Sequence, residues 1–251
     1  MRFRIVCLLS LFFVFVQFGI QAAPNELLTA AEKGDIEAVR QLLQQDSSLV
    51  AAADSQGYTP LHKAAYNNWL EVAEYLLAHG ADINALSRSG SAPLHGAASY
   101  GHLPMVRLLL EKGARLDIAN GSGFTPLLGA CASGRSDIAQ LLIEKGANVN
   151  SAMPDGRTPL LLAVWNNDTA HARFLLDRGA KADIRTNTGV SLPYVAATTR
   201  DRAFGRMFID RATDVNERDS IGLTMLHYAA ARGFSEQVQR LLDRGADLNA
   251  R

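Results

Sequence analysis

Six glycines stand 33 residues apart through most of this chain of 251 residues. They are Gly57, Gly90, Gly123, Gly156, Gly189 and Gly222, each followed two positions later by Thr, Ala or Ser. A period of this length predicts one supersecondary unit repeated in tandem, because each copy can bury its apolar face only against its neighbours. Stacks of this kind usually work as binding surfaces, so the search for function turns to partners.

The second copy shows the local design of the unit most clearly. Residues 54–58 form a turn, after which Thr59 is placed to cap a helix whose first position is Pro60. Apolar residues recur at helical spacing over 70–77, and Gly80 is placed to end that second helix in a left-handed conformation. The pattern therefore predicts two short antiparallel helices followed by a protruding hairpin.

The same residues carry a resemblance to a known family. Thr59-Pro60-Leu61-His62 matches the T-P-L-H signature of the ankyrin repeat, and Ala92-Pro93-Leu94-His95 matches most of it. Gly-Ala pairs of the family's G-A-D-x-N segment recur at residues 80, 113, 146, 179 and 245. The resemblance implies an all-α solenoid of about seven helix-turn-helix repeats with β-hairpin-like connecting loops.

The glycine register divides the chain. We expect an N-terminal capping repeat at 24–53, followed by repeats at 54–86, 87–119, 120–152, 153–185, 186–218 and 219–251. The sixth copy departs most from the pattern, so lower stability or a bend is predicted over 190–215. At the far end, Gln237, Gln239 and Arg240 are expected to give partial polar cover.

The first 23 residues differ from all that follows. Arg2 and Arg4 precede a run of twelve nearly unbroken apolar residues, 5–16, and small residues lead to Pro24. This arrangement is typical of a secretory signal peptide cleaved near Ala22 or Ala23, and it predicts an exported protein, with the bacterial periplasm as the expected compartment. Because the cleavage site is imperfect, an uncleaved membrane anchor stays open as the alternative.

Charge and motifs exclude several classes of function. Without the first 23 residues the chain carries 23 basic and 25 acidic residues, a balance that gives no support for nucleic-acid binding. Cys131 is then the sole cysteine, and it is expected as a small buried residue. No nucleophile elbow, phosphate-binding loop or metalloprotease motif occurs, so we expect no catalytic residue, cofactor, metal or small-molecule substrate.

The histidines favour structural roles over a metal site. His62 and His95 occupy equivalent positions in adjacent repeats, roughly 10 Å apart, whereas ligands of one zinc lie about 2 Å from it. We therefore expect these two and His227 to hydrogen-bond backbone groups in the neighbouring turn. His79 and His171 are expected as isolated surface residues.

Partner contact is expected at variable positions. In ankyrin stacks, hairpin tips and the exposed ends of the first helices line a concave binding surface, and aromatic and arginine residues most often anchor interfaces. The matching positions here are Tyr58, Tyr66, Arg88, Tyr100, Phe124, Arg157, Trp165 and Arg232. The alternative is that Tyr58 and Phe124 fold over neighbouring tips and that Trp165 fills a gap between helices. Trp69 is a weaker candidate for contact.

These observations predict a non-catalytic, exported scaffold that engages a protein partner. The resemblance to secreted and periplasmic bacterial members of the family implies two roles: an accessory protein in envelope oxidative-stress defence, or an immunity protein that neutralises a toxin. The alternative is a membrane-tethered structural protein that associates with itself, in which the apolar N-terminus stays uncleaved.

Overall fold

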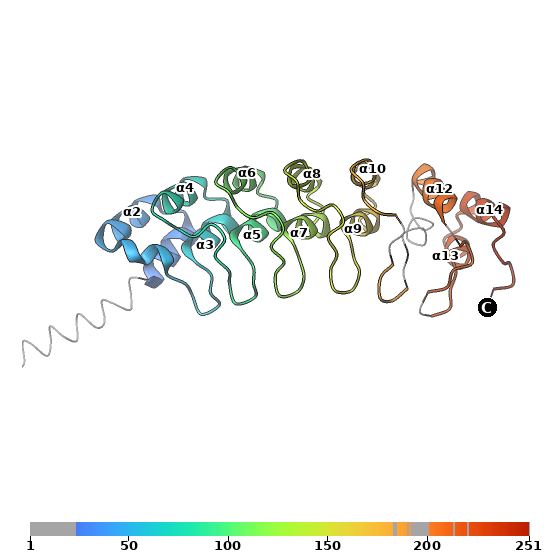
Figure 1. Cartoon of the computed structure of the whole chain (residues 1–251), viewed down its shortest axis with the longest axis horizontal. Coiled ribbons are helices and arrows are strands. Elements are labelled where there is room, and N and C mark those ends of the chain that lie inside the picture. Colours follow the sequence, from blue (N-terminus) through green and yellow to red (C-terminus); the bar gives the residue numbers. More distant parts are fainter. Residues whose placement is uncertain are drawn as a thin grey trace, which may run out of the picture. The chain divides into compact units, whose positions relative to one another are not determined.

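The computed structural model describes residues 24–182, 185–189, 191, 201–212, 214–219 and 221–250 (Figure 1). The predicted signal peptide lies outside these residues, and so does most of the first half of the irregular sixth copy. The chain divides into two compact units, residues 1–121 and 122–251. Each unit is described on its own.

The described part of the first unit begins with a helical segment at 24–33. It continues with α2 (Ile36–Gln45), the 3₁₀ helix η1 (Ser47–Ala51), α3 (Pro60–Asn67), α4 (Leu70–Ala78), α5 (Pro93–Tyr100) and α6 (Leu103–Glu111). Helix α3 packs against α4 and α5, and α4 packs against α2 and α6. Thus α3 and α5 form one layer while α2, α4 and α6 form the other, as Figure 1 shows.

The second unit repeats this plan. Its helices are α7 (Pro126–Ala132), α8 (Ser136–Glu144), α9 (Pro159–Trp165), α10 (Thr169–Asp177), α12 (Arg202–Arg211), α13 (Met225–Ala231) and α14 (Ser235–Asp243). Helices α7 and α8 pack as a pair, as do α9 and α10, and α13 and α14. No strand occurs within the described ranges, although one isolated bridge joins Arg185 and Ser191. The predicted all-α repeat fold is confirmed.

The helix starts follow the predicted chemistry. The Thr59 side chain accepts a hydrogen bond from the backbone N–H of His62 at 3.4 Å, and Thr125 and Thr158 make the same contact at 3.2 and 3.3 Å. Proline occupies the first position of each of these three helices. Each cap satisfies an amide that the helix leaves unpaired, which explains the recurring Thr-Pro pair.

The glycine ladder meets two requirements at once. Gly57 has a φ of +80°, and a Cβ atom there would lie 3.0 Å from the backbone nitrogen of Arg88 in the next hairpin. That nitrogen donates to the carbonyl oxygen of Gln56 at 2.8 Å. A side chain at position 57 would strain the turn and push the neighbouring hairpin away, so glycine is required for conformation and for close stacking.

Asparagines of the G-A-D-x-N segment join consecutive copies within each unit. The Asn84 side-chain oxygen accepts from the Arg115 amide at 2.9 Å. The Asn150 side chain accepts from the Lys181 amide at 2.8 Å and donates to the Gly179 carbonyl at 3.1 Å. The asparagine therefore fixes the spacing between successive loops.

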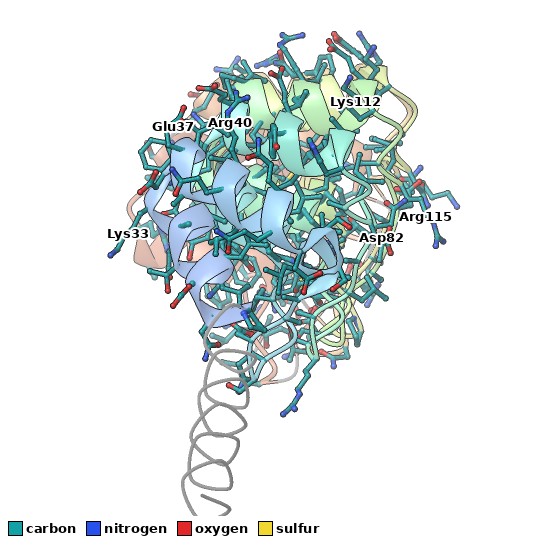
Figure 2. The ribbon with its side chains drawn as sticks, turned by 90° about the vertical axis from the view of Figure 1, so that its left-hand side faces the viewer. Lys33, Glu37, Arg40, Asp82, Lys112 and Arg115 are labelled. Carbon is teal, nitrogen blue, oxygen red and sulfur yellow. The ribbon has the colours of Figure 1, made fainter. Side chains whose placement is uncertain are left out.

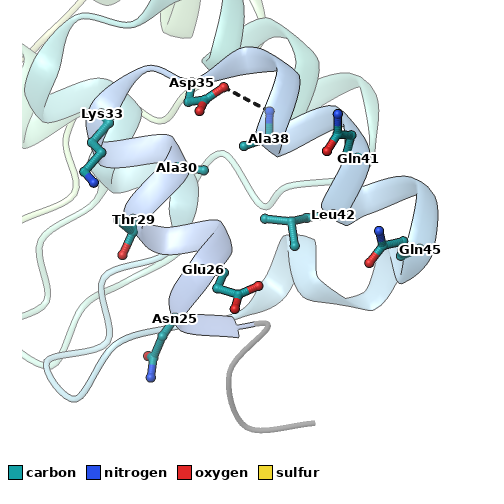
Figure 3. Close-up of a pocket in the computed structure, with 10 residues that line it drawn as sticks. All are labelled: Asn25, Glu26, Thr29, Ala30, Lys33, Asp35, Ala38, Gln41, Leu42 and Gln45. Carbon is teal, nitrogen blue, oxygen red and sulfur yellow. Dashed lines mark hydrogen bonds between the residues drawn. The ribbon is translucent and has the colours of Figure 1, made fainter. Parts of the chain in front are cut away.

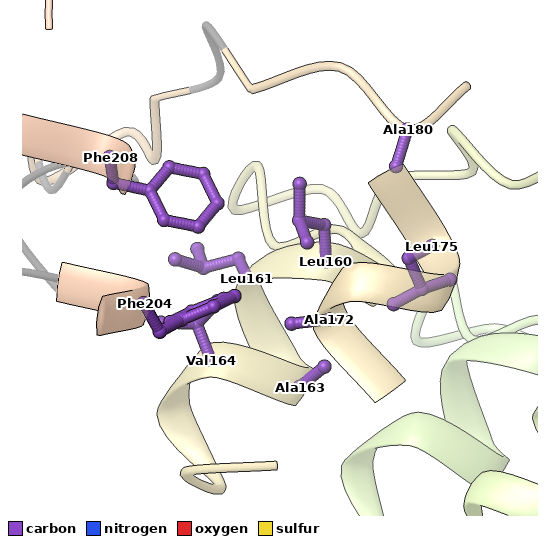
Figure 4. Packing of buried hydrophobic residues seen from close by; sticks show 9 residues of the cluster. All are labelled: Leu160, Leu161, Ala163, Val164, Ala172, Leu175, Ala180, Phe204 and Phe208. Carbon is purple, nitrogen blue, oxygen red and sulfur yellow. The ribbon is translucent and has the colours of Figure 1, made fainter. Parts of the chain in front are cut away.

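The core of the second unit runs continuously from one copy to the next. Figure 4 shows the rings of Phe204 and Phe208 from α12 facing Leu161 and Val164 of α9. The two rings meet edge to face, with centroids 4.9 Å apart, and both are fully buried. At about 25 cal/mol per Å² of buried apolar surface, such rings contribute a large part of local stability.

Charged side chains lie on the outside and pair across neighbouring copies. Figure 2 views the first unit from its N-terminal side, with Lys33, Glu37 and Arg40 at one edge and Asp82 and Arg115 at the other. Arg40 of α2 bonds Glu71 of α4 at 3.1 Å. Exposed pairs of this kind contribute only about 0–1 kcal/mol each, so they tune the register of helices that apolar packing holds together.

Two expectations about polar residues are wrong. His171 is 2% exposed, and Gln237 is 1% exposed, so neither lies on the surface as predicted. Both occupy a position of the 33-residue register that Val72, Met105 and Ile138 fill with buried apolar side chains. The helix face, rather than the polarity of the residue, decides where these side chains go.

Candidate functional site

Three predicted contact residues lie together in a row on the first unit. Tyr58 belongs to the turn before α3, Tyr66 lies near the end of α3, and Tyr100 is the last residue of α5. The ring centroids of Tyr58 and Tyr66 are 5.5 Å apart, and those of Tyr66 and Tyr100 are 5.4 Å apart. Both pairs are nearly perpendicular, with interplanar angles of 81° and 76°, which is a favoured aromatic arrangement.

A hollow of about 390 Å³ opens beside this row. We call it the tyrosine pocket, and it is lined by Glu32, Tyr58, Lys63, Tyr66, Asn67 and Tyr100. Tyr100 is 60% exposed, whereas Tyr58 and Tyr66 are half-buried. An aromatic surface of this kind, rimmed by charged groups, is typical of places where a partner docks.

The central ring is held by the neighbouring repeat. The Tyr66 ring lies over Gly96 of α5, where an added Cβ would come within 2.9 Å of its Cε1 atom. The Tyr66 carbonyl oxygen accepts a hydrogen bond from Nε2 of His102 at 2.8 Å. Burial, then the hydroxyl contact with Tyr58, raises the pKa of Tyr66, so its hydroxyl stays protonated. The row is therefore a preorganised, uncharged aromatic surface.

Charges around the tyrosine pocket are unequally compensated. Lys63 Nζ lies 2.9 Å from an Asp54 carboxylate oxygen and 5.5 Å from the centroid of the Tyr58 ring. Although burial acts to raise it, hydrogen bonds from Lys63 and from two turn amides lower the pKa of Asp54. The carboxylate of Glu32 is exposed and has no ion-pair partner within the described ranges. The lining with Asp54 thus carries one uncompensated negative charge.

The other predicted contact residues lie apart from this row. Arg88 is exposed at the tip of the next hairpin of the first unit. In the second unit, Phe124 is half-buried, and the Arg157 side chain bonds Asp155 of its own turn at 2.7 Å. Trp165 is 55% exposed at the end of α9, and Arg232 is exposed just after α13. A role for these residues in partner contact stays a prediction.

Sequence reasoning missed two lining residues of the pocket, Glu32 and Lys63. The register contains a signal for both. Glu32 aligns with Tyr66, once the one extra residue between the first two copies is counted, and Lys63 aligns with Gly96. Residues aligned in adjacent copies lie side by side in the stack, so the neighbours of a predicted contact residue can be read from the register.

Trp69 has a structural role. Its indole N–H donates to the Glu32 carbonyl at 2.9 Å, which is the bond that His102 makes to Tyr66 one copy later. The indole also lies against Gly34, where an added Cβ would come within 2.5 Å of a ring carbon. Trp69 therefore joins the first copy to the second, although 42% of it is exposed.

The histidines behave largely as predicted. Nδ1 of His62 accepts from the Thr59 amide at 3.1 Å, and Nε2 bonds the Ser91 carbonyl in the next turn at 2.9 Å. Nδ1 accepts from the backbone amide three residues earlier at 3.0 Å for His95 and 3.1 Å for His227. These bonds link the turns to the helices.

Cys131 and His171 form a buried pair in the second unit. Cys131 is 2% exposed, as predicted, and its Sγ lies 3.6 Å from Nε2 of His171. Burial raises the pKa of the thiol to about 12, and the nearby Asp168 charge adds to this effect. A neutral, enclosed thiol is unreactive, so the pair has no features of a nucleophilic site.

A second hollow lies on the outward side of the first copy. It has a volume of about 740 Å³ and lies between the helical segment 24–33 and α2 (Figure 3). Polar groups dominate its lining, and Asp35 already caps α2 through the Ala38 amide at 3.0 Å. This hollow has no aromatic residue in its lining, so we place the candidate site at the tyrosine pocket.

Two other searches return nothing within the described ranges. No three His, Cys, Asp or Glu side chains gather closely enough to hold a metal ion there. Across the same residues, no helix has the length and apolarity needed to cross a membrane.

Comparison with known proteins agrees with this architecture. The family described as ankyrin repeats (3 copies) matches residues 27–120 and 94–188, and the single ankyrin repeat matches 221–251. Ankyrin repeat domain-containing protein 49 of Bos taurus is 48% identical over 61 residues, which are 24% of this chain and 26% of that protein. The serine/threonine-protein kinase VIK of Arabidopsis thaliana is 45% identical over 62 residues, 25% of this chain and 14% of the kinase.

A further relative is the 2-5A-dependent ribonuclease of Mus musculus, 40% identical over 58 residues, 23% of this chain and 8% of the ribonuclease. The similarity thus covers about a quarter or less of each relative. Ankyrin repeats are generally non-catalytic and mediate protein–protein interaction, including where they are joined to enzymes. With family matches over more than half of its length, this chain belongs to the ankyrin-repeat family.

Proposed function

We propose that this protein is a non-catalytic scaffold that binds a protein partner through the tyrosine pocket and the adjoining ends of its first helices. The observation that carries the proposal is the row of Tyr58, Tyr66 and Tyr100. A large exposed aromatic such as Tyr100 leaves apolar surface in water unless a partner covers it. Tyrosine is also among the residues that most often dominate binding energy.

The rigidity of the site favours binding further. The Gly96 and His102 contacts of Tyr66 fix the row before any partner arrives. A preorganised surface loses little side-chain entropy on association, which costs about 0.5–1.5 kcal/mol for each side chain immobilised. Exposed Trp165 and Arg232 offer a second contact area on the other unit.

We place the scaffold outside the cytosol, in the bacterial periplasm. The support is the N-terminal sequence, in which Arg2 and Arg4 precede a short apolar run and small residues. In that compartment two roles follow: an accessory protein that assists envelope defence against oxidative stress, or an immunity protein that neutralises a toxin. The second candidate function, a tethered structural protein, is favoured by the imperfect cleavage site. Sequencing the N-terminus of the exported protein separates the two, since the scaffold proposal requires a start near Ala23 or Pro24.

Site-specific photocrosslinking tests the binding surface. A photoreactive phenylalanine derivative replaces Tyr100 in the full chain, and in a matched control it replaces Glu74, an exposed residue of α4 outside the pocket. We expect a discrete partner adduct from position 100 and none from position 74. Tyr66→Ala combined with Tyr100→Ala should abolish capture without loss of helical circular dichroism. Equal adducts at both positions, or capture that survives the double substitution, would remove the proposal.

A further inference from the structure

We propose that the tyrosine pocket receives an arginine side chain of the protein partner. The inference rests on the proposed function and specifies what the partner presents. It follows from three features of the pocket: neutral aromatic rings, one uncompensated carboxylate, and a lysine that is already paired.

The aromatic walls supply the first contribution. Tyr58 and Tyr66 are nearly perpendicular, so the pocket presents both a ring face and a ring edge. A guanidinium group is planar and weakly hydrated, and it binds favourably over such faces. Because the Tyr66 hydroxyl stays protonated, the rings attract a cation through their electron-rich faces without carrying a charge of their own.

Charge complementarity supplies the second contribution. The Lys63 ammonium group is occupied by Asp54 at 2.9 Å, so it is compensated within the protein. Glu32 is the remaining charged group of the lining, and its backbone is fixed by the bond from the Trp69 indole at 2.9 Å. A cation entering the pocket meets this carboxylate at the rim. An anionic side chain would meet the same carboxylate without compensation.

The protein contains the same arrangement within itself. The guanidinium group of Arg40 lies 4.8 Å from the centroid of the Tyr75 ring and donates to a carboxylate oxygen of Glu71 at 3.1 Å. An arginine, a tyrosine ring and a glutamate thus meet on the outer helices in a stable contact. The tyrosine pocket offers the tyrosine and the glutamate of this set, and the partner would supply the arginine.

The test uses the full chain with tyrosine rings labelled for NMR. The probe is the peptide acetyl-Gly-Arg-Gly-amide, titrated into the millimolar range, and the control is the same peptide with citrulline, which has the shape of arginine without its charge. Tyr75 is an internal control because its ring is already covered by Arg40. Glu32→Gln tests the carboxylate, and Glu74→Gln is its matched control on the exposed face of α4.

We expect saturable shifts of the Tyr66 and Tyr100 rings with the arginine peptide, little change at Tyr75, and none with citrulline. Glu32→Gln should weaken binding at least about threefold, the effect of a modest exposed charge pair, and Glu74→Gln should not. Equal shifts with citrulline, no shift with arginine, or unchanged binding in Glu32→Gln overturns the inference. If photocrosslinking through position 100 still captures the partner in Glu32→Gln, the scaffold proposal stands while the arginine inference fails.

Discussion

His171 provides the sharpest test of how the repeat register controls stability. Its imidazole is 2% exposed, Nδ1 has no hydrogen-bond partner within the described residues, and Nε2 meets only the sulfur of Cys131 at 3.6 Å. Met105 occupies the equivalent position and is fully buried. We predict that His171→Met raises the free energy of unfolding by about 1 kcal/mol at about pH 7.5, since an unsatisfied buried polar atom costs about 1–3 kcal/mol. The weak contact with sulfur offsets part of that gain.

The advantage of the methionine variant should grow in acid. Burial lowers the pKa of His171, although the Asp168 charge opposes the shift. Below the unfolded-state histidine pKa of about 6.5, the unfolded chain therefore binds a proton that the folded chain does not, and stability falls as the pH drops toward the folded pKa. The loss is at most about 1.4 kcal/mol per pH unit over that window, and Asp168 reduces it.

Urea unfolding followed by circular dichroism, at about pH 7.5 and about pH 5.5, measures both effects. Burial also lowers the pKa of His62, and this contribution is common to the wild type and the variant, so it cancels in their difference. His79→Gln is the control, because His79 is exposed and its removal should change neither stability nor the pH slope. A methionine variant that is less stable at both pH values, or whose advantage does not grow in acid, would refute the reasoning.

Three further predictions concern packing. Gly123→Ala should cost about 2 kcal/mol in unfolding free energy, because φ is +79° and the added Cβ would lie 2.3 Å from a proline ring; Gly146→Ala, with φ +100° and open space, should cost less in the same assay. Gly96→Ala should change stability by no more than about 1 kcal/mol, since better helix propensity offsets crowding, but should shift the Tyr66 ring resonances and weaken partner capture. Cys131, in a chain whose other cysteine is serine, should react with a thiol reagent at least about 100-fold more slowly when folded than in urea.

The repeat unit could be predicted because its interactions are local and recur. The Thr-Pro helix starts, the Asp54 turn and the Gly57 conformation each depend on residues within a few positions of one another. Six copies in one register then remove the ambiguity that a single copy would leave. Bonds between copies, such as that from Asn84 to the Arg115 amide, were not predicted, since their partners lie 31 residues away and one of them is a backbone group.

The error on His171 came from weighing the residue type without its place in the register. Histidine on a second helix is usually exposed, but position 171 aligns with Val72, Met105 and Ile138, which all face the core. The alignment carries enough information to predict burial. It does not contain the sulfur contact, because that depends on how Cys131 of the preceding copy packs against α10.

The tyrosine pocket shows which deviations from the register matter for binding. Position 63 in the second copy carries a lysine, and position 96 in the third carries a glycine, although the two are equivalent. The lysine closes the charge of Asp54, and the glycine leaves room for the Tyr66 ring. If the two residues were exchanged, the ring would lose its seat and the pocket its paired cation. Binding specificity in this unit therefore depends on how adjacent copies differ at one aligned position, while the residues that are the same in every copy hold the pocket in place.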